Sequence, residues 1–92
     1  MAITDQIRGL IGEDLATMRG RPFQVARVSD NTVIYRVGGR DRPGQMKNYE
    51  AVLDYLGSGN QVNGPGDIQK VCPTDQNTAY EWAVLKRLRV LR

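Results

Sequence analysis

The most informative part of the chain is residues 48–92, NYEAVLDYLGSGNQVNGPGDIQKVCPTDQNTAYEWAVLKRLRVLR. Its first apolar residues recur at helical spacing, which predicts a helix from Asn48, as the N-cap, to about Leu56. The glycine- and asparagine-rich segment GSGNQVNGPG then predicts a loop. A short helix over residues 68–72 ends at Pro73, and a longer helix, capped by Thr74 or Asn77, runs to about residue 89. We therefore expect three helices separated by two breaks.

The segment before this stretch predicts a helix followed by a hairpin. Apolar residues at three- and four-residue spacing indicate an amphipathic helix over residues 4–19, with Thr4 as N-cap and Gly20 as C-cap. This helix either packs on the body of the fold or serves as a dimerisation arm. Residues 22–37, PFQVARVSDNTVIYRV, are rich in β-branched and aromatic residues on either side of a turn at residues 29–31, which predicts an antiparallel β-hairpin.

Residues 38–44, GGRDRPG, predict a second turn, and residues 45–47 a brief third strand. Arg40 and Arg42 in this turn either clamp a phosphate together with backbone N–H groups or keep an exposed hairpin tip soluble. Together these elements predict one α+β domain over residues 1–92. It consists of an N-terminal helix (1–20), a β-hairpin or three-stranded meander (22–47) and a C-terminal three-helix unit (48–92).

Composition excludes several classes of protein. At 92 residues the chain is long enough for one modest core. It has no apolar run near the roughly 20 residues of a membrane span, and its N-terminus does not resemble a secretory signal, so we expect no membrane partner. The single cysteine, Cys72, fits a reducing cytoplasm. With no histidine, His-dependent catalysis and most zinc sites are excluded, and no metal or cofactor is expected.

The distribution of charge is more informative than the net charge of +3. Residues 36–47 carry four basic side chains against one acid, and residues 86–92 carry four with no acid. Between these blocks, residues 48–85 carry one lysine against five acids. Two basic blocks suit a polyanion if the fold brings them onto one face. Alternatively, they are solvated surface charge together with a basic helix end.

The order of the last three helices resembles the helix-turn-helix and winged-helix DNA-binding superfamily, in which the second helix of the pair lies in the major groove. The resemblance implies that the last helix packs on the others through one face and exposes the other. The inward face would carry Ile68, Val71, Ala79, Trp82, Leu85 and Leu88, closing on Val52, Leu53 and Leu56. The outward face would carry Gln76, Asn77, Thr78, Tyr80, Glu81 and Val84.

This outward face has side chains that can read bases. Gln76 and Asn77 can pair with adenine, the methyl groups of Thr78 and Val84 can contact the methyl group of thymine, and Glu81 can accept from cytosine. Basic side chains nearby would contact phosphates, which gives affinity without sequence preference. These are Lys70, Lys86, Arg87 and Arg89, with Arg40 and Arg42 as further contacts from the turn.

We therefore expect a small non-catalytic DNA-binding protein, a regulator or an accessory subunit, that acts as a homodimer if it reads an operator. The alternative is a protein-interaction module that inhibits or adapts a larger partner. Enzyme activity is not expected, because the loop GSGNQVNGPG lacks the spacing of a nucleotide-binding loop and the two serines have no identifiable base.

Overall fold

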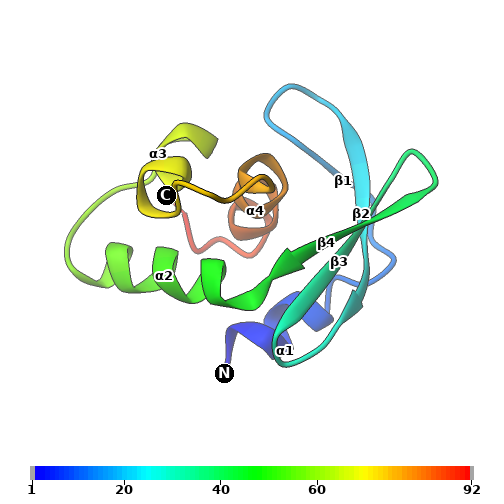
Figure 1. The fold of residues 1–92 in the computed structure, drawn as a ribbon, viewed down its shortest axis with the longest axis horizontal. Helices are drawn as coiled ribbons and strands as arrows, with labels where there is room; N and C mark the ends of the chain where they lie inside the picture. The colour runs from blue at the N-terminus through cyan, green and yellow to red at the C-terminus, as the bar shows by residue number, and fades with distance from the viewer. Residues whose placement is uncertain (1, 92) are drawn as a thin grey trace.

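The computed structural model, which describes residues 2–91, begins with a short helix, continues through a four-stranded antiparallel sheet and ends in three helices (Figure 1). This arrangement confirms the predicted α+β class. In chain order the elements are α1 (Ile3–Arg8), β1 (Leu15–Ala16), β2 (Pro22–Val28), β3 (Thr32–Val37), β4 (Arg40–Gln45), α2 (Met46–Gly57), α3 (Pro65–Val71) and α4 (Thr78–Arg87).

The sheet has the strand order β1-β2-β3-β4, so every strand pairs with its neighbour in the chain. Strands β2 and β3 form the hairpin predicted for residues 22–37, and Ser29 closes its turn by donating its N–H to the Thr32 carbonyl at 2.8 Å. Along β3 the side chains of Val33, Tyr35 and Val37 are buried while Arg36 is exposed. This alternation of period two shows that the face with Val33, Tyr35 and Val37 lies on the core.

The N-terminal helix predicted over residues 4–19 is wrong in its extent. Helix α1 ends at Arg8, its N-cap is Ala2 instead of Thr4, and Leu15 enters the sheet opposite Phe23. Two glycines explain the difference, because Gly9 caps the helix and Gly12 adopts a φ of +83°, which helices do not tolerate. Gly20 (φ +86°) belongs to the turn between β1 and β2 and is not a helix cap.

The strand predicted at residues 45–47 corresponds to β4, which is longer than predicted and lies earlier in the chain. Gly38 and Gly39, with φ values of +59° and +79°, make the turn alone, and β4 pairs with β3 along its whole length from Arg40 to Gln45. Pro43 is tolerated because β4 is an edge strand, where one side needs no ladder hydrogen bond. Helix α2 therefore starts at Met46, two residues before the predicted cap at Asn48.

The three C-terminal helices gather on the buried face of the sheet, with α4 between α3 and the strands (Figure 1). On the strand side, the ring of Tyr80 lies 5.1 Å from that of Phe23 and 5.4 Å from that of Tyr35. Helix α4 is thus a central element, covered on more than one side. Of the predicted core, Val52, Ile68 and Leu85 are fully buried, whereas six residues are only half-buried: Leu53, Leu56, Val71, Ala79, Trp82 and Leu88.

Candidate nucleic-acid interface

The face of α4 that was predicted to read DNA lies largely inside the protein. Tyr80 is 7% exposed, Asn77 is 8% exposed, and Glu81 and Val84 are fully buried. The expectation that these four side chains face outward is therefore wrong. The physical reason is that the sheet covers the side of α4 that an isolated helical unit would leave open, with Phe23 and Tyr35 packed on Tyr80.

Glu81 is a buried acid next to a second acid. The pKa of Glu81 is raised to about 9, first by burial and then by the hydrogen bond and the charge of the neighbouring Asp75. Neither Glu81 oxygen nor Oδ2 of Asp75 meets a hydrogen-bond donor, and two ionised carboxylates could only accept. A proton on Glu81 supplies the missing donor. At neutral pH Glu81 is thus a neutral group of the core and does not accept from a base.

Asn77 joins α4 to the edge strand. It stands at the N-cap position of α4, but its side chain makes no capping hydrogen bond. Instead Nδ2 donates to the Pro43 carbonyl at 2.9 Å, and Oδ1 accepts from Nε of Arg42 at 2.6 Å. The backbone N–H of Asn77 is satisfied by Oδ1 of Asp75 at 2.8 Å. All these contacts are within the protein, so the role of Asn77 is to hold the start of α4 against the edge strand β4.

The basic C-terminal end does not lie beside the start of α4. The helix has 10 residues and is thus about 15 Å long, which separates Arg87 and Arg89 from Gln76. Arg87 donates to the carboxylate of Glu13, in the segment between α1 and β1. Lys70 on α3 forms an ion pair of 3.7 Å with Asp67. The predicted grouping of Arg87 and Arg89 with the reading face is therefore wrong, while Lys70 pairs within its own helix.

The structure does bring part of the predicted site together around Arg42. Nη2 of Arg42 donates to the Gln76 carbonyl at 2.9 Å, and its guanidinium lies 5.6 Å from the centre of the Tyr80 ring. With the Asn77 contact, three neighbours fix this exposed side chain. Gln76 is exposed and Thr78 is half-buried beside it, and exposed Arg40 lies two residues away on β4. Gln76, Thr78, Arg40 and Arg42 thus form one accessible group.

Two further arginines lie at the same end of the sheet. Because Ala16 pairs with Pro22 and Val37 pairs with Arg40, the β1–β2 and β3–β4 turns project from one end, as Figure 1 shows, and the β2–β3 turn lies at the other. The first turn carries Arg19 and Arg21, both exposed. We call the group of Arg19, Arg21, Arg40 and Arg42 the arginine edge.

None of the four arginines of the arginine edge pairs with a carboxylate of residues 2–91. By contrast, Arg27 and Arg36 both lie against Asp41 on the outer face of the sheet. Sequence reasoning missed Arg19 and Arg21 because it placed the first in a helix. The signal was the sequence Arg19-Gly20-Arg21-Pro22, whose glycine and proline favour a turn.

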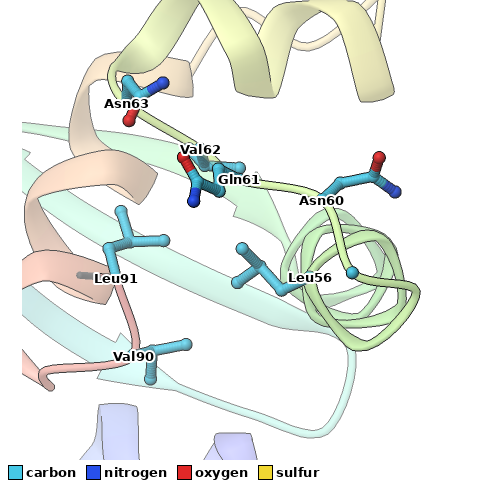
Figure 2. A pocket seen from close by; sticks show the side chains of 8 residues that line it. Leu56, Asn60, Gln61, Val62, Asn63, Val90 and Leu91 are labelled. Carbon is cyan, nitrogen blue, oxygen red and sulfur yellow. The ribbon is translucent and has the colours of Figure 1, made fainter.

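A separate pocket of about 330 Å³ lies where the end of α2, the following loop and the C-terminal segment meet. Figure 2 shows Leu56 and Leu91 pointing toward each other across it, with Gln61 beside them and Asn60 turned away. Its lining contains no charged side chain, and it is formed by Leu56, Gly59, Asn60, Gln61, Val62, Asn63, Val90 and Leu91.

The described part of the chain has no cluster of three or more acidic, cysteine or histidine side chains that could hold a metal ion. Among residues 2–91, every helix is too short or too polar to cross a membrane. Comparison with known proteins finds no matching family model, no similar curated protein and no similar solved structure.

Proposed function

We propose that this chain is a small non-catalytic DNA-binding protein, a regulator or an accessory subunit, that contacts duplex DNA through the arginine edge and not through α4. The observation that carries the proposal is the exposure of four arginines without a carboxylate partner in the described chain: Arg19, Arg21 and Arg40 at one end of the sheet, and Arg42 two residues further along β4. Guanidinium groups bind phosphate bidentately, and arginines left unpaired by the fold can form such contacts without breaking an internal ion pair.

The fixed geometry of Arg42 supports this proposal. Its contacts with Gln76, Asn77 and Tyr80 hold the guanidinium in place before any ligand arrives, which lowers the entropy lost on binding. Arg40, Gln76 and Thr78 beside it can add phosphate or base contacts. A cytoplasmic location suits a DNA-binding role, and its reducing conditions suit the single free Cys72.

A gel-shift titration with mixed-sequence duplex DNA tests the proposal. We expect micromolar or tighter binding at about 50 mM salt that weakens steeply by about 200 mM. The triple variant Arg19→Ala, Arg21→Ala, Arg40→Ala leaves the fixed Arg42 in place. It should reduce the slope of log affinity against log salt by roughly two to three.

A matched triple variant controls for net charge. Arg8→Ala, Lys70→Ala and Arg87→Ala remove three cations that already pair with Asp5, Asp67 and Glu13. We expect this variant to keep most of the affinity. No shift by the unmodified protein at 50 mM salt, or equal losses in both variants, would contradict DNA binding through the arginine edge.

A second candidate function, binding to a partner protein, is favoured by the uncharged pocket of Figure 2. Leu56 and Leu91 supply an apolar floor, and the carboxamide of Gln61 can bond to a peptide backbone. If this is the main function, Gln61→Arg should abolish complex formation with the partner, and DNA binding should be absent. Retention of the complex by the Gln61→Arg variant would exclude the pocket as its site.

A further inference from the structure

The turn between β1 and β2 is a narrow and rigid tip that carries half of the arginine edge. The N–H of Thr17 donates to the Arg21 carbonyl at 2.9 Å, and the N–H of Gly20 donates to the Thr17 carbonyl at 2.8 Å. The hydroxyl of Thr17 accepts from the N–H of Arg21 at 3.1 Å, so one buried threonine holds both ends of the turn. Pro22 fixes the backbone directly after it.

Two features make this tip slender and keep it in place. Gly20, between the two arginines, has a φ of +86° and no side chain, and the space beside its Cα is open, because an added Cβ would meet no atom within 4 Å. The methyl group of Met18 lies over Gly64 at the start of α3, where an added Cβ would approach it to 3.2 Å. Met18 thus packs the tip against the start of α3. Arg19 and Arg21 remain exposed, and neither side chain forms a hydrogen bond or ion pair with the described chain.

The two grooves of DNA differ in width and therefore in which parts of this protein can enter them. The major groove, about 12 Å wide, admits an α-helix or a two-stranded ribbon. Helix α4 is buried, and β1, with two residues, is too short to form such a ribbon with β2. The minor groove is about 6 Å wide and accepts extended arginine side chains, which are attracted most where A·T-rich sequence narrows it and concentrates negative potential.

We propose that Arg19 and Arg21 enter the minor groove of A·T-rich duplex DNA while Arg40 and Arg42 contact the adjacent phosphates; this inference rests on the proposed function. The guanidinium suits a groove that must be partly dehydrated, because it is less strongly hydrated than an ammonium group. Phosphate contacts by the second hairpin fix the orientation of the tip and add affinity for every sequence.

The test compares A·T-rich and G·C-rich duplexes of equal length by fluorescence anisotropy at low salt, with netropsin as a competitor for the minor groove. We expect roughly tenfold tighter binding to the A·T-rich duplex and displacement by netropsin. Changing Arg19 and Arg21 together to lysine keeps the charge and should remove most of this preference while general affinity remains. The matched change Arg40→Lys should leave the preference intact.

The outcomes separate this inference from the proposed function. Equal affinity for both duplexes, or binding that netropsin leaves unchanged, would overturn minor-groove insertion while DNA binding stands. A preference that survives the double lysine change would overturn the assignment to Arg19 and Arg21. Absence of binding to either duplex at low salt would overturn the proposed function together with this inference.

Discussion

The hydroxyl oxygens of Tyr35 on β3 and Tyr49 on α2 lie 2.5 Å apart, and both side chains are fully buried. This hydrogen bond joins the sheet to the first of the three C-terminal helices. Burial raises the pKa of both phenols well above the usual value, so both keep their protons at neutral pH. The pair is therefore a permanent link between two layers of the fold.

Removing one hydroxyl group of this pair should lower the free energy of unfolding more than removing both. Tyr35→Phe leaves the Tyr49 hydroxyl buried without its partner, and we expect a loss of about 1–3 kcal/mol in the free energy of unfolding. The double variant with Tyr49→Phe should recover part of that loss, because no unpaired hydroxyl remains. Urea denaturation of the four proteins measures the coupling. Strictly additive losses would show that the two hydroxyls do not interact.

Stability should fall as pH rises, because Glu81 has a higher pKa in the folded protein, about 9, than the value near 4.3 in an unfolded chain. The folded state therefore holds a proton that the unfolded state releases between these pH values. The stabilising effect is complete below about pH 4, decreases by up to about 1.4 kcal/mol per pH unit above it, and is lost above pH 9.

Glu81→Gln should flatten this dependence, since glutamine is neutral at every pH. Thermal denaturation between pH 5 and 9 compares it with the unmodified protein and with Glu50→Gln, which removes an exposed carboxylate from α2. We expect Glu81→Gln to be the more stable protein at pH 9. A parallel decline of the melting temperature in all three proteins would indicate that Glu81 is not the group responsible.

Gly44 should not tolerate a side chain. A Cβ at this position would lie 2.7 Å from Cε2 of Tyr35, whose ring is held by Phe23, Tyr80 and the hydroxyl of Tyr49. We expect Gly44→Ala to lower the free energy of unfolding by about 1–3 kcal/mol through overpacking. Gly57→Ala at the end of α2 is the control, because its Cβ would meet no atom within 4 Å. Similar effects of the two changes would mean that the Tyr35 ring can move aside.

Asn77→Ala should destabilise the fold by about 1–3 kcal/mol, because it removes the donor to the Pro43 carbonyl and the acceptor of the Arg42 N–H. Asn77→Asp keeps the acceptor and loses the donor, so its stability should lie between those of the alanine variant and the unmodified protein. Chemical denaturation gives the order of the three. If DNA binding is measured as well, any effect of Asn77→Ala should be the same for all sequences, because the buried Asn77 side chain contacts only the protein.

The sequence predicted the central hairpin well, because β-branched and aromatic residues on either side of the turn at residues 29–31 favour strands. It predicted the positions of the three last helices to within a few residues, because Pro73 and the glycine-rich loop mark their ends. Helical spacing does not show how many sides of a helix are covered, however. Glu81 was placed outside as a polar residue, and only the fold shows that it lies in the core as a neutral acid.

The sequence also could not show which basic side chains form ion pairs in the folded protein. Arg87 and Arg40 look equivalent in a count of basic residues, but Glu13 lies next to the first and no carboxylate of the described chain pairs with the second. Residue 13 is 74 positions away from residue 87, so no local pattern could reveal this contact. The accessible cations could be selected only once the ion pairs of the folded chain were known.

The contact of Asn77 with β4 bears on how the protein behaves at high concentration. The outer margin of a β-sheet offers free backbone groups that can recruit a strand from another molecule. Here the amide of Asn77 occupies the Pro43 carbonyl from within the same chain, and Pro43 itself has no N–H to offer. The segment that joins α3 to α4 thus also blocks this edge of the sheet from pairing with another molecule. Substitutions that break its contact with β4 should favour aggregation before they favour unfolding.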